Sequence, residues 1–96
     1  MTAITNAASE IINTGATLIT LGGDHSIALP LLRAHAKKYG PVSLVHIDAH
    51  IDTWESEFEE VKYSHGTPFR YALREGLIRA GEYMQIGLRG PLSGED

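Results

Sequence analysis

Apolar residues recur near the start of the chain at the spacing of an amphipathic helix. Their positions follow the i, i+3, i+4, i+7, i+8 pattern, which places them on one helical face. They are Ile4, Ala7, Ala8, Ile11 and Ile12. We therefore predict a helix over residues 4–13 that ends before Gly15, because glycine readily adopts the backbone conformation that follows a helix.

Three short runs of apolar and β-branched residues further along the chain predict strands. They are residues 16–21, 42–47 and 83–88. The first run is continuous and bounded by glycines, which is typical of a strand buried on both faces. We expect the second run to be buried as well.

Helical patterns separate these runs. Residues 27–39 have an apolar face and end with Lys37 and Lys38, where positive charge stabilises a helix C-terminus. Pro30 requires this helix to start close to Ser26 or to kink, because proline is tolerated only in the first helical turn.

A third helix is predicted to begin at Pro68, with Thr67 as its N-cap, and to end near Glu75. Residues 53–63 sustain neither helical nor strand periodicity, so we interpret them as a loop. The resulting order is helix, strand, helix, strand, loop, helix, strand. This order indicates an α/β fold with a parallel sheet and right-handed crossovers, with about three strands and three helices.

The composition limits the classes of protein to which the chain can belong. Its 96 residues, 43% of them hydrophobic, are enough for one small domain and too apolar for general disorder. With 12 acidic and 8 basic residues, the net charge is −4, and no basic stripe favours nucleic-acid binding. No apolar stretch approaches the roughly 20 residues that span a bilayer. We expect a cytoplasmic protein that binds neither nucleic acid nor membrane.

Candidate metal ligands follow two of the predicted strands. Asp48, His50 and Asp52 alternate after residues 42–47, so an extended continuation of that strand would point all three to one side. His25 follows the first predicted strand. The alternative is a helix-capping aspartate with loop histidines held by hydrogen bonds.

The types of these side chains narrow the choice of metal. The chain has no cysteine, which excludes thiolate zinc sites and cysteine nucleophiles. Imidazoles with carboxylates favour Mn(II), with Ni(II), Co(II), Fe(II) or Zn(II) as alternatives. Two imidazoles and two carboxylates would suit a pair of ions bridged by one carboxylate.

The other histidines have less defined roles. His46 falls within a hydrophobic strand, so we interpret it as a buried, hydrogen-bonded residue or a partner of the ligands rather than a ligand. His35 is expected to face solvent. His65 precedes a helix N-terminus, whose dipole disfavours imidazolium, so it is a candidate proton shuttle. Its alternative is a loop histidine held by local hydrogen bonds.

Three ordered segments of the chain resemble signatures of the ureohydrolases, the arginase and agmatinase family, with the agmatinase type most similar. The segments are GGDHS at 22–26, DAHID at 48–52 and SHGTPF at 64–69. The resemblance runs through the whole chain. It implies that residues 1–96 are a single, incomplete segment of a three-layer αβα arginase-like fold with a mainly parallel sheet.

The resemblance also implies roles for individual residues. His25, Asp48 and Asp52 would hold one manganese ion, and Asp48 and His50 would help to hold a second, with Asp48 bridging. His65 would match the catalytic histidine. Two further aspartates, from a Ser-x-Asp-x-Asp signature that this sequence lacks, would complete the two metal sites.

The implied reaction is hydrolysis of a small cationic guanidino compound to urea and an amine. Arginases usually have asparagine where this chain has Trp54, which makes Trp54 a candidate substrate residue and agmatine, cleaved to putrescine and urea, the expected substrate. Guanidinobutyrase or arginase activity is the alternative. The complete protein would be a homo-oligomer in polyamine biosynthesis, and the isolated chain would be inactive. The alternative to an enzyme is a non-catalytic segment that binds metal or assembles with a partner chain.

Overall fold

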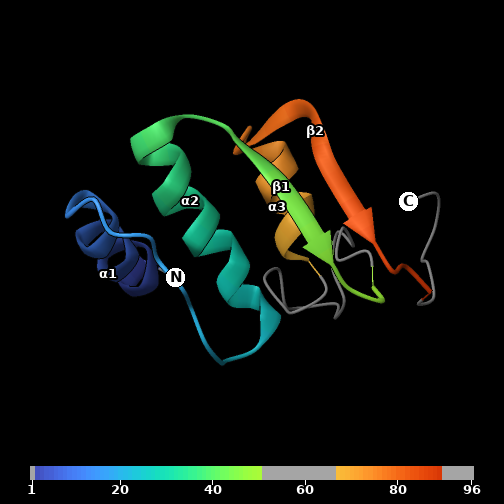
Figure 1. The fold of residues 1–96 in the computed structure, drawn as a ribbon, viewed down its shortest axis with the longest axis horizontal. Helices are drawn as coiled ribbons and strands as arrows, with labels where there is room; N and C mark the ends of the chain where they lie inside the picture. Colours follow the sequence, from blue (N-terminus) through green and yellow to red (C-terminus); the bar gives the residue numbers. More distant parts are fainter. Residues whose placement is uncertain (1, 51–66, 90–96) are drawn as a thin grey trace.

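A computed structural model of the chain describes residues 2–50 and 67–89. The predicted loop at 53–63 lies outside these ranges. The elements, in chain order, are α1 (Thr2–Asn13), the 3-10 turn η1 (His25–Ile27), α2 (Ala28–Tyr39), β1 (Val42–Ile47), α3 (Pro68–Arg74) and β2 (Ile78–Ile86). The two strands run parallel, and their arrows point the same way in Figure 1. The predicted α/β class is confirmed.

The two strands pair in two stretches separated by an irregularity. Val42 lies opposite Ile78, and pairing resumes where Leu44 lies opposite Tyr83. Between these points β2 contains extra residues, among them Gly81 with a φ of 78°. The predicted third strand at 83–88 therefore starts too late and ends too late, because a glycine that interrupts the apolar pattern hides the first paired residues.

A polar contact ties the strands together near this irregularity. The hydroxyl of Ser43 donates to a carboxylate oxygen of Glu82 at 2.5 Å, and the guanidinium of Arg79 lies 3.1 Å from the same carboxylate. The hydrogen bond from Ser43, helped by the charge of Arg79, lowers the pKa of Glu82.

Helices α2 and α3 cover one face of the sheet (Figure 1). Their core contains Leu29, Leu32, Phe69, Tyr71, Ala72 and Ile78. The opposite face carries alternate apolar residues that are exposed: Val45, Ile47, Met84 and Ile86. The prediction of a buried strand over residues 42–47 is therefore correct for one face only, because the described residues place helices on a single side of the sheet.

Helix α1 packs against α2 on the side away from the sheet (Figure 1). Ala8 and Ile12 of α1 meet Ala34 of α2 in a small buried cluster. The ammonium group of Lys38 donates to the carbonyl oxygen of Ile12 at 2.8 Å, near the C-terminus of α1. The predicted helix over residues 4–13 is confirmed, but only Ala8 and Ile12 of its apolar face are buried, whereas Ile4 and Ile11 are 38% and 45% exposed.

The predicted strand at 16–21 is wrong. The structure assigns no strand there, and Ile19 and Leu21 are 82% and 91% exposed. Within this run, Leu18 is partly buried and packs against the cluster of Ala8, Ile12 and Ala34. A strand requires hydrogen bonds to a neighbouring strand, and the sheet of the described residues contains only β1 and β2.

The remaining helix predictions are confirmed. The turn η1 precedes α2, so Pro30 falls in the first turn of that helix, where its missing N–H costs little. Helix α3 starts at Pro68 with Thr67 in the N-cap position, although the Thr67 side chain makes no capping hydrogen bond. The guanidinium of Arg33 on α2 binds both carboxylate oxygens of Glu75, at 2.8 and 2.6 Å, at the end of α3.

Candidate metal centre

Asp48 follows β1 directly, and β2 holds its backbone in place. The Asp48 amide donates to the carbonyl oxygen of Ile86 at 3.0 Å, and the amide of Arg89 donates to the carbonyl of Ala49 at 2.8 Å. Gly87 has a φ of 92°, and a Cβ atom there would lie 3.4 Å from the Asp48 carbonyl oxygen. Backbone hydrogen bonding thus continues beyond the ends of both strands, as far as Ala49 and Arg89, and fixes the position from which the Asp48 carboxylate projects.

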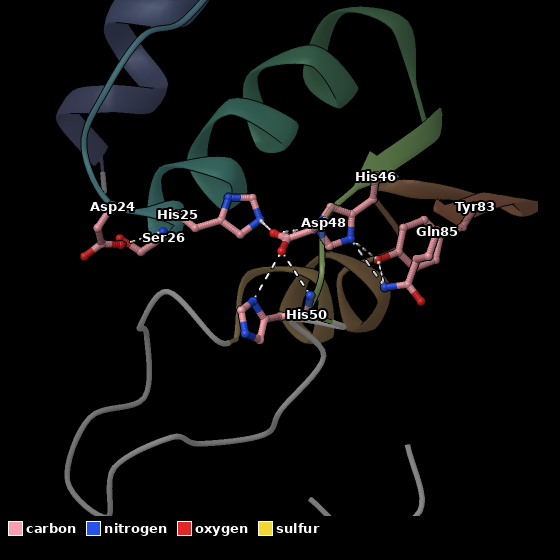
Figure 2. Close-up of polar contacts among 8 residues, drawn as sticks. All are labelled: Asp24, His25, Ser26, His46, Asp48, His50, Tyr83 and Gln85. Atoms are coloured by element: carbon pink, nitrogen blue, oxygen red, sulfur yellow. Dashed lines mark hydrogen bonds and ion pairs between the residues drawn. The ribbon is translucent and has the colours of Figure 1, made fainter. Parts of the chain in front are cut away.

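Three imidazoles surround the carboxylate of Asp48 (Figure 2). The Nε2 atoms of His46 and His25 lie 3.3 and 3.9 Å from its Oδ2 oxygen. The Nδ1 atom of His50 lies 3.3 Å from Oδ1, and the His50 amide donates to that same oxygen at 3.0 Å. The two carboxylate oxygens therefore face different histidines.

The glycine-rich segment before α2 brings His25 to this carboxylate. The side chain of Asp24 accepts a hydrogen bond from the Ser26 amide at 2.7 Å and so caps η1. In Figure 2, Asp24 points away from Asp48, whereas His25 points toward it. Asp24 thus caps the start of η1, and its neighbour His25 faces the site.

Aromatic packing supports the two inner histidines. The ring of Phe69, from the first turn of α3, lies 4.3 Å from the His46 ring and 5.3 Å from the His25 ring, measured between centroids. Phe69 is only 3% exposed. The first turn of α3 therefore forms an apolar support that restricts both imidazoles.

His46 is buried, as predicted, with 5% of its surface exposed. Its Nδ1 atom lies 3.3 Å from the hydroxyl of Tyr83 and 3.3 Å from the amide nitrogen of Gln85, both on β2. The Gln85 amide also donates to the Tyr83 hydroxyl at 2.8 Å. No sequence pattern singles out Tyr83 and Gln85 as site residues, because only the strand register places them beside His46.

The donor set fits a divalent metal ion. Among the described residues, His25, His46 and Asp48 offer ligand atoms that all lie within 4.8 Å of one another. Nitrogen and oxygen donors without thiolate suit ions such as Mn(II), Fe(II), Co(II) or Ni(II). The group includes His46, which the sequence analysis did not favour as a ligand.

The structure describes only part of the predicted site. It brings His25, Asp48 and His50 together, whereas Asp52, Trp54 and His65 lie outside the described residues. The expected extended continuation beyond β1 is wrong, because the chain bends at residues 49–50, where the His50 amide bonds back to the Asp48 side chain.

His35 does not simply face solvent: it is half-buried, and its Nδ1 atom lies 2.8 Å from the carbonyl oxygen of Leu31. In the described ranges, no helix has the length and apolar character needed to cross a membrane.

The model of the arginase family matches residues 1–96. Among curated proteins, the mitochondrial agmatinase of Gallus gallus is 52% identical over 81 residues, which cover 84% of this chain and 24% of that protein. The mitochondrial guanidino acid hydrolase of Homo sapiens is 48% identical over 87 residues, which cover 91% of this chain and 24% of that protein. The chain thus spans about a quarter of the length of these relatives.

The same similarity extends to three-dimensional structure. The crystal structure of a hypothetical agmatinase from Burkholderia thailandensis superimposes with a TM-score of 0.83 at 46% sequence identity. The match covers 94% of this chain and 29% of that one. The arrangement of helices and strands described above is therefore an arginase-like one.

Proposed function

Since the chain belongs to the arginase family, we propose that it forms part of a binuclear manganese hydrolase that cleaves a guanidino compound into urea and an amine. Agmatine is the proposed substrate, with putrescine as the amine, which would give the enzyme a role in polyamine biosynthesis. The similarity to the agmatinase of Gallus gallus and to the hypothetical agmatinase of Burkholderia thailandensis supports this choice.

One observation carries the proposal: a carboxylate at the carboxyl end of a parallel strand is surrounded by imidazoles. Ligands of α/β proteins bind at this end of the sheet. His25 and His50 face opposite oxygens of Asp48, with Nε2 of His25 at 3.9 Å from Oδ2 and Nδ1 of His50 at 3.3 Å from Oδ1. A carboxylate approached in this way is suited to bridge two ions.

We assign His25, Asp48 and Asp52 to one Mn(II) ion, and Asp48 and His50 to a second. When bound, such ions lower the pKa of water enough for hydroxide to be available near neutral pH, which a resonance-stabilised guanidinium requires as a nucleophile. The carboxylates offset the positive charge of the ions, so that a cationic substrate can approach. The ligands that complete the two sites would lie outside these four residues.

His65 and Trp54 are the other residues of this chain in the proposed site. The His65 imidazole, neutral at first, would take up a proton. It would then act as a general acid and give that proton to the amine as it leaves. Trp54 is a candidate contact for the far end of the substrate. Both assignments rest on the sequence.

Two chimeras test the proposed activity. The 96-residue segment would replace the matching stretch of the chicken agmatinase and, separately, that of the human guanidino acid hydrolase. Urea release from agmatine and from 4-guanidinobutyrate would be measured with added Mn(II). We expect both chimeras to be active and Asp48→Asn to abolish the activity of each.

The outcomes separate the competing functions. A shift of both chimeras toward agmatine, compared with their parents, would support agmatine as the substrate. A shift toward the guanidino acid would replace agmatine with that substrate class. Chimeras that fold and assemble like their parents but release no urea from either compound would overturn the hydrolase assignment and favour a non-catalytic metal-binding or assembly role.

The remaining expectations for the complete protein stay predictions. We propose a cytoplasmic homo-oligomer, and we expect the 96-residue chain alone to release no urea because its residues provide only part of the ligand set for two ions. A urea assay on the chain with added Mn(II) checks the second statement, and turnover would contradict it.

A further inference from the structure

His46 lies between the proposed metal ligand Asp48 and two polar residues of β2 (Figure 2). Its ring is only 5% exposed, and Phe69 packs against it with 4.3 Å between ring centroids. A buried ring held in this way has little freedom to turn. The hydrogen-bonding groups at its two nitrogen atoms therefore determine which nitrogen carries the proton.

The groups next to Nδ1 of His46 can donate hydrogen bonds to it. An amide nitrogen donates hydrogen bonds and accepts none, and Nε2 of Gln85 lies 3.3 Å from Nδ1 of His46. The same amide donates to the Tyr83 hydroxyl at 2.8 Å. That hydroxyl lies 3.3 Å from Nδ1 and has its own proton to donate there. Both contacts favour an Nδ1 atom that accepts.

The group at Nε2 requires the opposite role. An ionised carboxylate only accepts hydrogen bonds, and Oδ2 of Asp48 lies 3.3 Å from Nε2 of His46. The contact is favourable when Nε2 carries the proton and donates it. The two ends of the ring therefore select the same neutral tautomer, with hydrogen on Nε2 and none on Nδ1.

We propose that His46 is a positioning residue that donates from Nε2 to the carboxylate of Asp48, and that it is not itself a metal ligand. This inference rests on the proposed metal site. A protonated Nε2 has no lone pair for an ion. Of the three possible ligands His25, His46 and Asp48, we therefore retain only His25 and Asp48 as ligands. The Tyr83 and Gln85 pair selects the tautomer.

The donation orients the proposed bridging carboxylate. Oδ2 of Asp48 accepts from His46, and Oδ1 accepts from the His50 amide at 3.0 Å. A carboxylate has about four lone-pair sites, so accepting these two hydrogen bonds is compatible with metal binding by the same carboxylate. One hydrogen bond to each oxygen fixes the plane of the carboxylate, as partners behind metal ligands commonly do.

Nitrogen-15 NMR of the metal-free 96-residue chain, at a pH where the imidazoles are neutral, tests the tautomer directly. We expect the His46 ring to show a protonated Nε2 and an unprotonated Nδ1. The opposite tautomer, or a ring that exchanges between both, would overturn the proposal. This measurement needs neither metal nor a variant, so its result is independent of whether the hydrolase assignment is correct.

Metal binding tests the positioning role. His46→Gln keeps a donor at the reach of Nε2, whereas His46→Leu removes it, and Mn(II) affinity would be measured by calorimetry. We expect His46→Leu to weaken binding about 10- to 100-fold, the usual effect of losing a partner behind a metal ligand, and His46→Gln to restore most of the affinity. Equal losses in both variants would identify His46 as a ligand instead.

A third variant acts on the tautomer without touching the metal site. Gln85→Glu places an acceptor at Nδ1, which should move the ring proton to Nδ1 and deprive Asp48 of its donor. We expect the NMR spectrum to show the exchanged tautomer and Mn(II) binding to weaken. An exchanged tautomer with unchanged affinity would show that the donation to Asp48 does not matter for binding.

Discussion

Asp48 and Asp24 form a matched pair that separates metal binding from helix and turn capping. Each accepts a hydrogen bond from the amide two residues later, from His50 at 3.0 Å and from Ser26 at 2.7 Å. Only Asp48 faces the imidazoles (Figure 2). Replacing each aspartate with asparagine keeps the capping oxygen and removes the charge, so the two variants differ in the proposed metal role.

The structure gives the expected magnitudes. Asparagine has one side-chain oxygen, so at position 48 it cannot accept on separate oxygens from the His50 amide and from His46. We expect Asp48→Asn to cost about 0.5–1.5 kcal/mol of unfolding free energy, the net value of one hydrogen bond. Asp24→Asn should lower the unfolding free energy by at most roughly a few tenths of a kcal/mol, because asparagine caps as well as aspartate.

Metal affinity should separate the two variants much further. Loss of a partner behind a ligand costs about 10- to 100-fold, and loss of the proposed bridging ligand should cost at least the upper value, about 2.7 kcal/mol. Mn(II) binding can be followed by the decrease in the electron paramagnetic resonance signal of the free ion. Asp24→Asn should bind like the unmodified chain. If Asp48→Asn binds equally well, or if both variants lose affinity alike, Asp48 is not a ligand.

Three further predictions concern the support of the site and the sheet. Phe69→Ala should lower the free energy of unfolding, measured in urea, by about 3–5 kcal/mol because it leaves a cavity beneath two histidines. Leu73→Ala, at a position 47% exposed on the same helix, should lower it by about 0.5 kcal/mol or less. Similar losses in the two variants would show that the aromatic support is unimportant. Gly87→Ala should cost about 1–2 kcal/mol because it places a side chain at positive φ, and an unchanged urea midpoint would contradict this. Ser43→Ala should raise the pKa of Glu82 toward its ordinary value, because the hydroxyl stabilises the ionised carboxylate. The contact therefore stabilises the fold above the ordinary pKa of Glu82, and this stabilisation is lost as the pH falls through the lowered pKa. Carbon-13 NMR titration of the Glu82 carboxylate should detect the rise, and an unchanged titration curve would refute the stated cause.

Local sequence predicts those elements whose formation depends on local interactions. The apolar spacing of α1 and the proline at the start of α3 are recorded in adjacent residues, and both helices form where expected. Residues 16–21 have the composition of a strand but are not paired in the described sheet. Whether an apolar run becomes a strand depends on a neighbouring strand, which the run itself does not encode.

The same distinction applies to the site. His25 and Asp48 were expected together because each follows a predicted strand, and the structure brings them together, although residues 16–21 before His25 form no strand in the described sheet. The contacts of His46 with Tyr83 and Gln85 depend on the register of β1 against β2, and that register includes an irregularity beside Gly81. No spacing rule within either strand predicts such a shift, so the partners of His46 became visible only in three dimensions.

The parallel pairing of β1 with β2 also determines the order in which the chain can fold. Val42 pairs with Ile78, which lies 36 positions later (78 − 42), and closing a flexible loop of that size costs roughly 3 kcal/mol before any contact repays it. Helices can form earlier from local contacts, whereas Asp48 gains its backbone partner on Ile86 only after the strands meet. The metal donors should therefore converge late in folding, and the rate at which a freshly diluted, unfolded chain acquires the ability to bind Mn(II) should follow the slow closure of the sheet rather than the fast appearance of helix.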